Sequence, residues 1–217
     1  MKIMLPSKFI AAGLLSLIIS VEDSFAQFNL VVGPKGGVAV TSFSGDGAGN
    51  VTTRTTGLGG LFLNAQFGEV FNVQPEFLIG QRGGTITNEN TTNNFSLSYF
   101  DVPVLLKFRL PVDKVFYPHV LLGPDFAFNT NTKVTSSDTQ TGTEVAVSGG
   151  QFNQSDIGAL AGAGIDFQSK RIFVTLDARY GYSFNDVGTS NSSVALNFRN
   201  TGWSFTAGVG IRLFNND

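Results

Sequence analysis

Residues 99–110 read YFDVPVLLKFRL, a stretch in which two kinds of side chain alternate. The first set is apolar and consists of Phe100, Val102, Val104, Leu106, Phe108 and Leu110. The second set carries the charges of Asp101, Lys107 and Arg109. Successive side chains of a β-strand point to opposite faces. The stretch therefore predicts a strand with one apolar face and one charged face.

The same period of two recurs in eight segments, although glycine dilutes it in the first two. We predict strands at 28–40, 57–68, 71–82, 99–110, 117–128, 156–167, 172–182 and 203–214. Every charge within them lies on the face opposite the apolar one. The cations are Lys35, Arg82, Lys107, Arg109, Arg179 and Arg212, and the anions are Glu76, Asp101, Asp125, Asp156, Asp166 and Asp177.

The connections between these segments alternate in length. Long polar ones at 41–56, 83–98, 129–155 and 183–202 alternate with tight ones near 68–70, 111–114 and 168–171. Short periplasmic turns, long external loops and an even strand number are typical of outer-membrane barrels. We therefore predict an all-β fold, an eight-stranded antiparallel up-and-down transmembrane β-barrel. The alternative is a soluble lipocalin-like binding protein, whose apolar face would point inward.

The N-terminus predicts export from the cytoplasm. Lys2 and Lys8 precede an apolar run at 9–21, and small residues at Ser24 and Ala26 suit a signal peptidase. We expect residues 1–26 to be a signal peptide. Residues 27–217 then form one outer-membrane β-barrel domain, located in the cell outer membrane.

Composition narrows the possible partners. The chain contains no cysteine, which excludes disulfides and cysteine-ligated metals. A net charge of −2 gives no electrostatic reason to expect nucleic acid as a partner. The expected partner is outer-membrane lipid, with envelope or secretion proteins as further candidates. The sequence does not indicate an oligomeric state.

The equal number of interior cations and anions predicts a structural ion-pair core. An eight-stranded barrel has a lumen that side chains just fill, and buried charges are tolerated when they are paired. Glycines on the same face leave room for long Arg and Lys side chains, and these are Gly158, Gly162, Gly164, Gly208 and Gly210. This interpretation is favoured over a pore lining or a catalytic site.

Three features of the sequence are candidate chemical sites. His119 is the single histidine, and its predicted place near the periplasmic end favours a hydrogen-bonded interior role over catalysis or metal binding. The segment 45–50 lacks the acidic spacing of a calcium loop, and 158–164 lacks the spacing of a dinucleotide fingerprint. We predict no catalytic residue, no cofactor and no metal, and hence no enzyme.

Two further expectations concern the strand ends. Aromatic residues near those ends, including Phe214 close to the C-terminus, predict interfacial girdles. Proline lacks the N–H donor of a regular ladder. Local bulges or strand ends are therefore expected at Pro34, Pro75, Pro103 and Pro124.

Several stretches resemble one known family. The segments QPEFL at 74–78 and GQRGG at 80–84 resemble its third strand, and residues 99–108 resemble its fourth. Similar matches are PHVLLGP at 118–124 and AGAGI at 161–165. The chain resembles PorT-like outer-membrane β-barrels of Gram-negative bacteria. That resemblance implies a link to protein export by a dedicated secretion system, and it supplies no catalytic residues.

The functional hypothesis is an integral outer-membrane barrel with a structural or interaction role, supporting protein secretion or envelope integrity. The alternatives are a narrow porin-like pore and the soluble binding protein.

Overall fold

The computed structural model describes residues 28–45, 51–87, 91–138, 144–148, 153–186 and 199–213. The predicted signal peptide, its cleavage site and Phe214 lie outside the described residues, so the expectations about them stay predictions. No helix among the described residues is long and apolar enough to cross a membrane.

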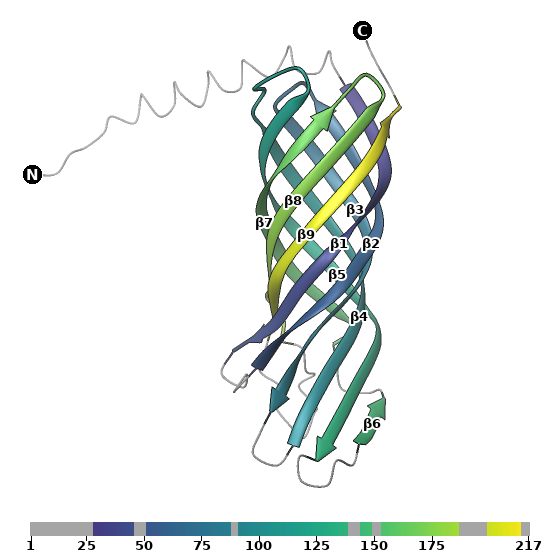
Figure 1. Cartoon of the computed structure of the whole chain (residues 1–217), viewed down its shortest axis with the longest axis vertical. Coiled ribbons are helices and arrows are strands. Elements are labelled where there is room, and N and C mark those ends of the chain that lie inside the picture. Colours follow the sequence, from purple (N-terminus) through teal and green to yellow (C-terminus); the bar gives the residue numbers. More distant parts are fainter. Residues whose placement is uncertain are drawn as a thin grey trace, which may run out of the picture.

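The described chain forms a closed antiparallel barrel of eight strands (Figure 1). Neighbours in sequence pair with each other, and β1 pairs with β9 to complete the ring. A short extra strand, β6, pairs only with the external part of β5. The strands are β1 (Phe28–Ser44), β2 (Val51–Phe67), β3 (Phe71–Thr87), β4 (Thr91–Arg109), β5 (Phe116–Asp138), β6 (Glu144–Ser148), β7 (Ser155–Gln168), β8 (Ile172–Ser183) and β9 (Arg199–Arg212). The predicted fold class is confirmed.

The strands are longer than the sequence predicted at the end opposite the tight turns. Most residues of the expected loops at 41–56 and 83–98 lie in strands, and β5 continues to Asp138. Figure 1 shows β3, β4 and β5 extending beyond the rest of the barrel. These extensions are rich in Thr, Ser and Asn, and apolar alternation within them is confined to short pieces such as Phe95 and Leu97 of β4. Backbone pairing holds them all the same, because every N–H and C=O of a ladder is satisfied whatever the side chain.

The tight turns lie where they were expected. β2 and β3 are joined by Gly68–Val70, and Gly68 has a φ of 72°, a conformation that favours glycine. The β4–β5 and β7–β8 connections are also short, at 110–115 and 169–171.

The expectation of bulges at the four prolines is wrong. Pro34 pairs with Leu61 in the β1–β2 ladder, while the β1–β9 ladder skips that position and resumes in the same register. Pro75, Pro103 and Pro124 also lie in ladders that keep their register. A residue in an antiparallel ladder bonds toward one neighbouring strand, so a missing N–H interrupts one ladder without displacing a strand. The two register shifts of the described ladders lie at Thr53–Leu58 and Ser98–Tyr99.

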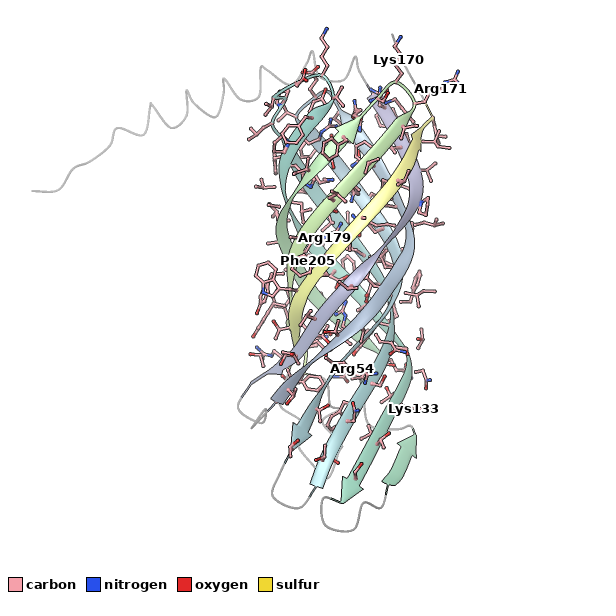
Figure 2. The ribbon with its side chains drawn as sticks, viewed as in Figure 1. Arg54, Lys133, Lys170, Arg171, Arg179 and Phe205 are labelled. Atoms are coloured by element: carbon pink, nitrogen blue, oxygen red, sulfur yellow. The ribbon has the colours of Figure 1, made fainter. Side chains whose placement is uncertain are left out.

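The apolar face points outward and the charged face points into the lumen. Phe205 is 49% exposed on the barrel wall, whereas Arg179 is 1% exposed inside it (Figure 2). Ile79, Val120 and Leu176 are exposed like Phe205. The labelled surface cations lie near the two ends, with Lys170 and Arg171 at one and Arg54 and Lys133 at the other. A soluble lipocalin would have the reverse arrangement, so that alternative is wrong.

Aromatic side chains form a row around part of the barrel at the tight-turn end. Phe28, Phe67, Phe71 and Phe108 lie on four successive strands, with neighbouring ring centroids 5.5–6.0 Å apart. At the other end Tyr180 packs against Trp203, with centroids 5.3 Å apart. These described aromatics lie at the two ends, as the girdle prediction requires. Tyr99 and Tyr117, also near strand ends, are instead buried in the lumen.

The outward orientation predicts a large penalty for a charge on the lipid-facing wall. Leu176→Arg should destabilise the barrel by about 2–4 kcal/mol when the position lies near the bilayer midplane. The measurement is a denaturant folding titration in lipid vesicles. Val112→Arg is the matched control, because Val112 is exposed in the β4–β5 turn outside the strands. Equal stabilities of the two variants would contradict the orientation.

Candidate functional site

The lumen is filled by one connected set of polar side chains. At its centre Lys35 of β1 donates to Glu76 of β3 over 2.8 Å and to Asp177 of β8 over 2.5 Å. Arg179 of β8 donates from Nη1 and Nη2 to Glu76 over 2.7 Å each, and from Nη2 to Asp177 over 2.6 Å. All four side chains are 2% exposed or less. Two cations and two carboxylates thus link strands from opposite sides of the barrel.

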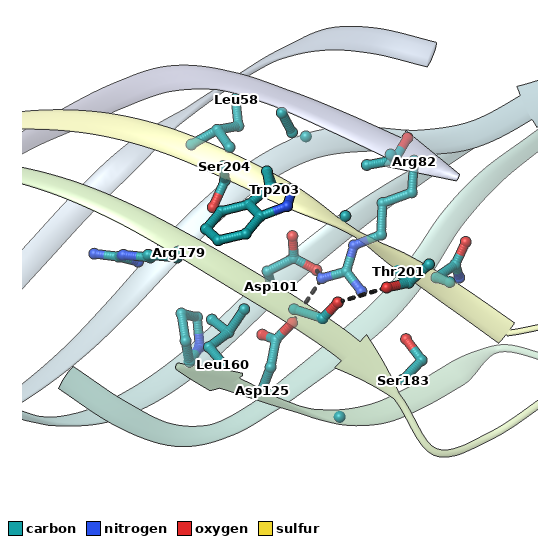
Figure 3. A pocket seen from close by; sticks show the side chains of 18 of the residues that line it. Leu58, Arg82, Asp101, Asp125, Leu160, Arg179, Ser183, Thr201, Trp203 and Ser204 are labelled. Carbon is teal, nitrogen blue, oxygen red and sulfur yellow. Dashed lines mark hydrogen bonds and ion pairs between the residues drawn. The ribbon is translucent and has the colours of Figure 1, made fainter. Parts of the chain in front are cut away.

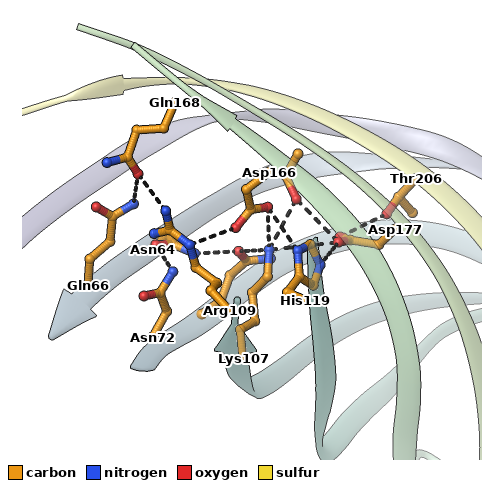
Figure 4. Close-up of polar contacts among 12 residues, drawn as sticks. Asn64, Gln66, Asn72, Lys107, Arg109, His119, Asp166, Gln168, Asp177 and Thr206 are labelled. Carbon is orange, nitrogen blue, oxygen red and sulfur yellow. Dashed lines mark hydrogen bonds and ion pairs between the residues drawn. The ribbon is translucent and has the colours of Figure 1, made fainter. Parts of the chain in front are cut away.

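A second cluster lies beside the first and shares Asp177 with it (Figure 4). Lys107 of β4 donates to Asp166 of β7 over 2.9 Å and to Thr175 of β8 over 3.1 Å. His119 of β5 places Nε2 2.7 Å from Asp177 Oδ1 and Nδ1 3.3 Å from Asp166 Oδ1. His119 therefore lies between two buried carboxylates, as an interior hydrogen-bonded residue.

His119, Asp166 and Asp177 bring ligand atoms within 4.8 Å of one another, which is close enough for a metal ion. Lys107 Nζ, however, lies 2.9 Å from Asp166 Oδ1 and 3.7 Å from Asp177 Oδ1. The ammonium group thus already supplies the positive charge among these oxygens. Lys107 also approaches the ring of Phe173, 5.9 Å from its centroid.

Amide side chains form a layer at the periplasmic end, a role that was not predicted from the sequence. Asn64 donates to Gln74 over 2.7 Å, and Gln66 donates to Gln168 over 3.1 Å. Arg109 donates to the same Gln168 oxygen over 3.0 Å, and its guanidinium carbon lies 4.0 Å from the centroid of Tyr117. Their positions in the alternating pattern could have indicated this role, because the amides lie on the same face of their strands as the charged residues.

The external half of the lumen has a different composition. Arg82 of β3 donates to Asp101 over 2.8 Å and to Asp125 over 2.7 Å, and its Nη1 lies 3.8 Å from Asp156 (Figure 3). One cation thus faces three carboxylates. Beyond it an apolar cluster, which we call the external plug, fills the lumen on the β1, β4 and β5 side. Its buried members are Phe43, Phe95, Leu97, Tyr99 and Ala127.

The sequence could not reveal the external plug, because Phe95 and Leu97 lie in a segment that was expected to be a loop. The Arg82 guanidinium stacks over the ring of Tyr99 at 5.1 Å and joins the plug to the charged layer.

The glycines of the charged face make room, but the neighbours they admit differ from those predicted. A Cβ on Gly164 would lie 2.6 Å from His119 Nε2 and 2.8 Å from Asp177 Oδ1. A Cβ on Gly208 or Gly210 would lie within 3.0 Å of the buried ring of Phe62. At these three glycines the close side chains are an imidazole, a carboxylate and a phenyl ring rather than the expected Arg and Lys. Of the two glycine-rich segments considered as chemical sites, 158–164 lies in β7. Residues 46–50 of the other segment, 45–50, lie outside the described residues.

The shared position of Asp177 predicts that its charge stabilises the barrel strongly. Asp177→Asn should cost about 3–5 kcal/mol, because Lys35 and Arg179 would keep their charges with one counter-ion fewer. The free energy of unfolding in lipid vesicles measures the effect. Asp113→Asn, in the exposed β4–β5 turn, is the control and should change stability by less than about 0.5 kcal/mol. A stable Asp177→Asn barrel would show that the network contributes little.

Comparison with known proteins places this geometry in a family. The family model described as "Outer membrane protein beta-barrel domain" matches residues 25–189. No curated protein matches the sequence significantly.

Among solved structures, the outer membrane protein OprG from Pseudomonas aeruginosa is 13% identical, with 86% of this chain and 96% of that chain covered and a TM-score of 0.51. Neisserial surface protein A is 14% identical, with coverages of 84% and 96% and a TM-score of 0.46. The Ail protein of Yersinia pestis, crystallised with the heparin analogue sucrose octasulfate, is 19% identical, with coverages of 85% and 99% and a TM-score of 0.42. With its lipid-facing apolar wall and buried charges, this chain belongs to the outer membrane protein beta-barrel domain family and is located in the cell outer membrane.

Proposed function

We propose that this protein is a closed, PorT-like barrel with a structural or interaction role in the outer membrane, supporting protein secretion or envelope integrity. The observation that carries the proposal is the filled lumen. Lys107, Arg109 and Arg179 are among the largest fully buried side chains, and each is hydrogen-bonded to groups on other strands. An interior of this kind serves as the core of a scaffold.

The pairing argues against the narrow pore as an alternative. A permeating ion would have to separate Lys35 and Arg179 from Glu76 and Asp177. Breaking such buried pairs costs several kcal/mol, since each separated charge is left without compensation. The external plug adds an apolar obstruction, and apolar constrictions resist hydration.

The motifs that carry the family resemblance support a structural role. Gln74 and Glu76 of the third strand are buried and bonded to each other over 2.6 Å. In the fourth strand, Asp101 binds Arg82 and Lys107 binds Asp166. These residues therefore build the interior network, and none of them faces a partner outside the barrel. Among the described residues, the external extensions of β3, β4 and β5 provide a polar surface for a secretion or envelope partner.

The same geometry supports a role without catalysis. His119 is the candidate acid–base residue of the chain, and its side chain has no exposed surface. Both of its ring nitrogens face carboxylates within the lumen. A general base has to reach the proton of a bound substrate, and His119 is directed at protein groups instead.

Conductance in planar bilayers tests the closed lumen. The purified barrel should insert without discrete conductance steps. Arg179→Ala is the matched variant, because it removes the largest side chain from the central cluster and should produce measurable leak. Steps in the unmodified protein that equal those of Arg179→Ala would contradict a closed interior and favour the pore.

A deletion strain tests the role in secretion. Loss of the protein should remove exported proteins from the cell surface, and complementation should restore them. The measurement is a quantitative surface proteome, recorded with permeability to large hydrophilic antibiotics to report envelope integrity. An unchanged proteome and unchanged permeability would together contradict the proposed role.

A further inference from the structure

The tight-turn end of the barrel carries an exposed apolar surface that the interior network does not explain. Leu110, Val112 and Val115 of the β4–β5 turn and Val70 of the β2–β3 turn are all at least 49% exposed. The carbonyl of Val70 accepts the N–H of Arg109, at the end of β4, so the two turns are neighbours. Four exposed apolar side chains on adjacent turns favour contact with something less polar than water.

Three cations lie on the same surface. Lys114 is in the β4–β5 turn, and Lys170 and Arg171 are in the β7–β8 turn (Figure 2). The N–H of Gln168 donates to the carbonyl of Val115 over 2.8 Å, so these two turns are neighbours as well. The three cations are exposed, and none forms an ion pair with a residue that the structure describes. Their charges are therefore available to a partner outside the barrel.

The two acidic residues of these turns leave the positive charge in place. Asp113 Oδ1 accepts the backbone N–H of Lys114 over 2.6 Å, which directs the carboxylate into its own turn. Glu69 lies in the β2–β3 turn, and the β4–β5 turn separates it from the β7–β8 turn. The side of the surface that contains Lys170 and Arg171 is thus positive.

The position of this surface along the barrel matches the headgroup layer of the lipid. Phe108 and Phe167 face outward among the phenyl rings of this end, which place the edge of the hydrocarbon as girdles do in outer-membrane barrels. Leu110 follows Phe108 by two residues, or about 7 Å along a strand. Lys170 follows Phe167 by three residues. The polar layer of one leaflet is about 5–8 Å thick, so both turns reach it.

We propose that this surface, formed by the turns at 68–70, 110–115 and 169–171, binds anionic phospholipid headgroups of the periplasmic leaflet. The Arg171 guanidinium pairs with two phosphate oxygens, and the Lys170 ammonium group acts as a point charge beside them. The apolar side chains of the β4–β5 turn lie against the upper part of the acyl chains. Cations combined with apolar side chains are typical of protein surfaces that lie in a membrane interface.

The depth of the surface favours lipid over an acidic polypeptide as its partner. Lipid surrounds the barrel at this level, so headgroups already meet Lys170 and Arg171, whereas a polypeptide would have to displace them. Each Lys or Arg close to an anionic membrane surface strengthens the association about fivefold. The proposal depends on the location in the outer membrane and not on the role in secretion.

The test measures the lipid selectivity of the protein purified from outer membranes and reconstituted in phosphatidylcholine vesicles. Each sample contains a trace of spin-labelled phosphatidylglycerol or of spin-labelled phosphatidylcholine. Electron spin resonance reports the fraction of each label that the barrel immobilises. The anionic label should associate several-fold more strongly than the neutral one. The preference should fall in 1 M salt, where the Debye length is about 3 Å.

Variants locate the site. Lys170→Gln should lower the preference by a factor of about two to five, and the double variant with Arg171→Gln should abolish it. Lys133→Gln is the matched control, because it makes the same substitution at an exposed residue of β5 at the other end of the barrel (Figure 2). The control should leave the preference unchanged.

Two results would overturn the proposal. Equal association of the two labels would leave an acidic polypeptide as the partner of this surface. A preference that the double variant keeps would show that anionic lipid binds elsewhere on the barrel. Neither result bears on the role in secretion, which the deletion strain tests separately.

Discussion

Asp177 is the interaction centre on which the interior depends. Its carboxylate contacts Lys35 of β1, Lys107 of β4, His119 of β5 and Arg179 of its own strand. The backbone ladders connect each strand only to its neighbours, whereas this carboxylate connects strands across the lumen. Gly164 gives His119 the space to reach it. These polar contacts thus form a core that links opposite sides of the single-layered barrel wall.

The interior charges are balanced in number but separated along the barrel axis. In the external layer, Arg82 faces three aspartates. The centre and the periplasmic end together hold five cations and three anions. In the central clusters, neighbouring cations share carboxylates. The cations of that second group are Lys35, Lys107, Arg109, Arg179 and Arg212, and the anions are Glu76, Asp166 and Asp177. Most of these side chains are buried, so their fields are weakly screened. The negative layer lies toward the external rim, next to the external plug.

Much of the fold could be predicted from the sequence, and the limits of that prediction have physical causes. Alternation identified the eight strands where one face meets lipid. It failed in the external extensions, where Thr, Ser and Asn predominate and the few apolar side chains, such as Phe95 and Leu97, point into the lumen. The six cations and six anions were assigned to the right face. Their partners were not predictable, because Lys35 and Asp177 lie 142 residues apart and meet only through strand tilt and stagger. The amide layer was missed because uncharged amides give no distinctive pattern, and the external plug was missed because Phe95 and Leu97 were assigned to a loop.

The ion pairs also explain why this chain adopts one register. A buried salt bridge gains little net stability, since desolvation offsets much of the attraction. A strand that slipped by one residue, however, would turn its whole interior face toward lipid. β4 alone would then expose Asp101, Lys107 and Arg109, and a cation at the bilayer midplane costs about 2–4 kcal/mol. The charges therefore act chiefly against alternative pairings. The regular ladders through Pro34, Pro75, Pro103 and Pro124 fit this account, because a proline that removes one backbone bond cannot shift a strand whose side chains forbid the slip.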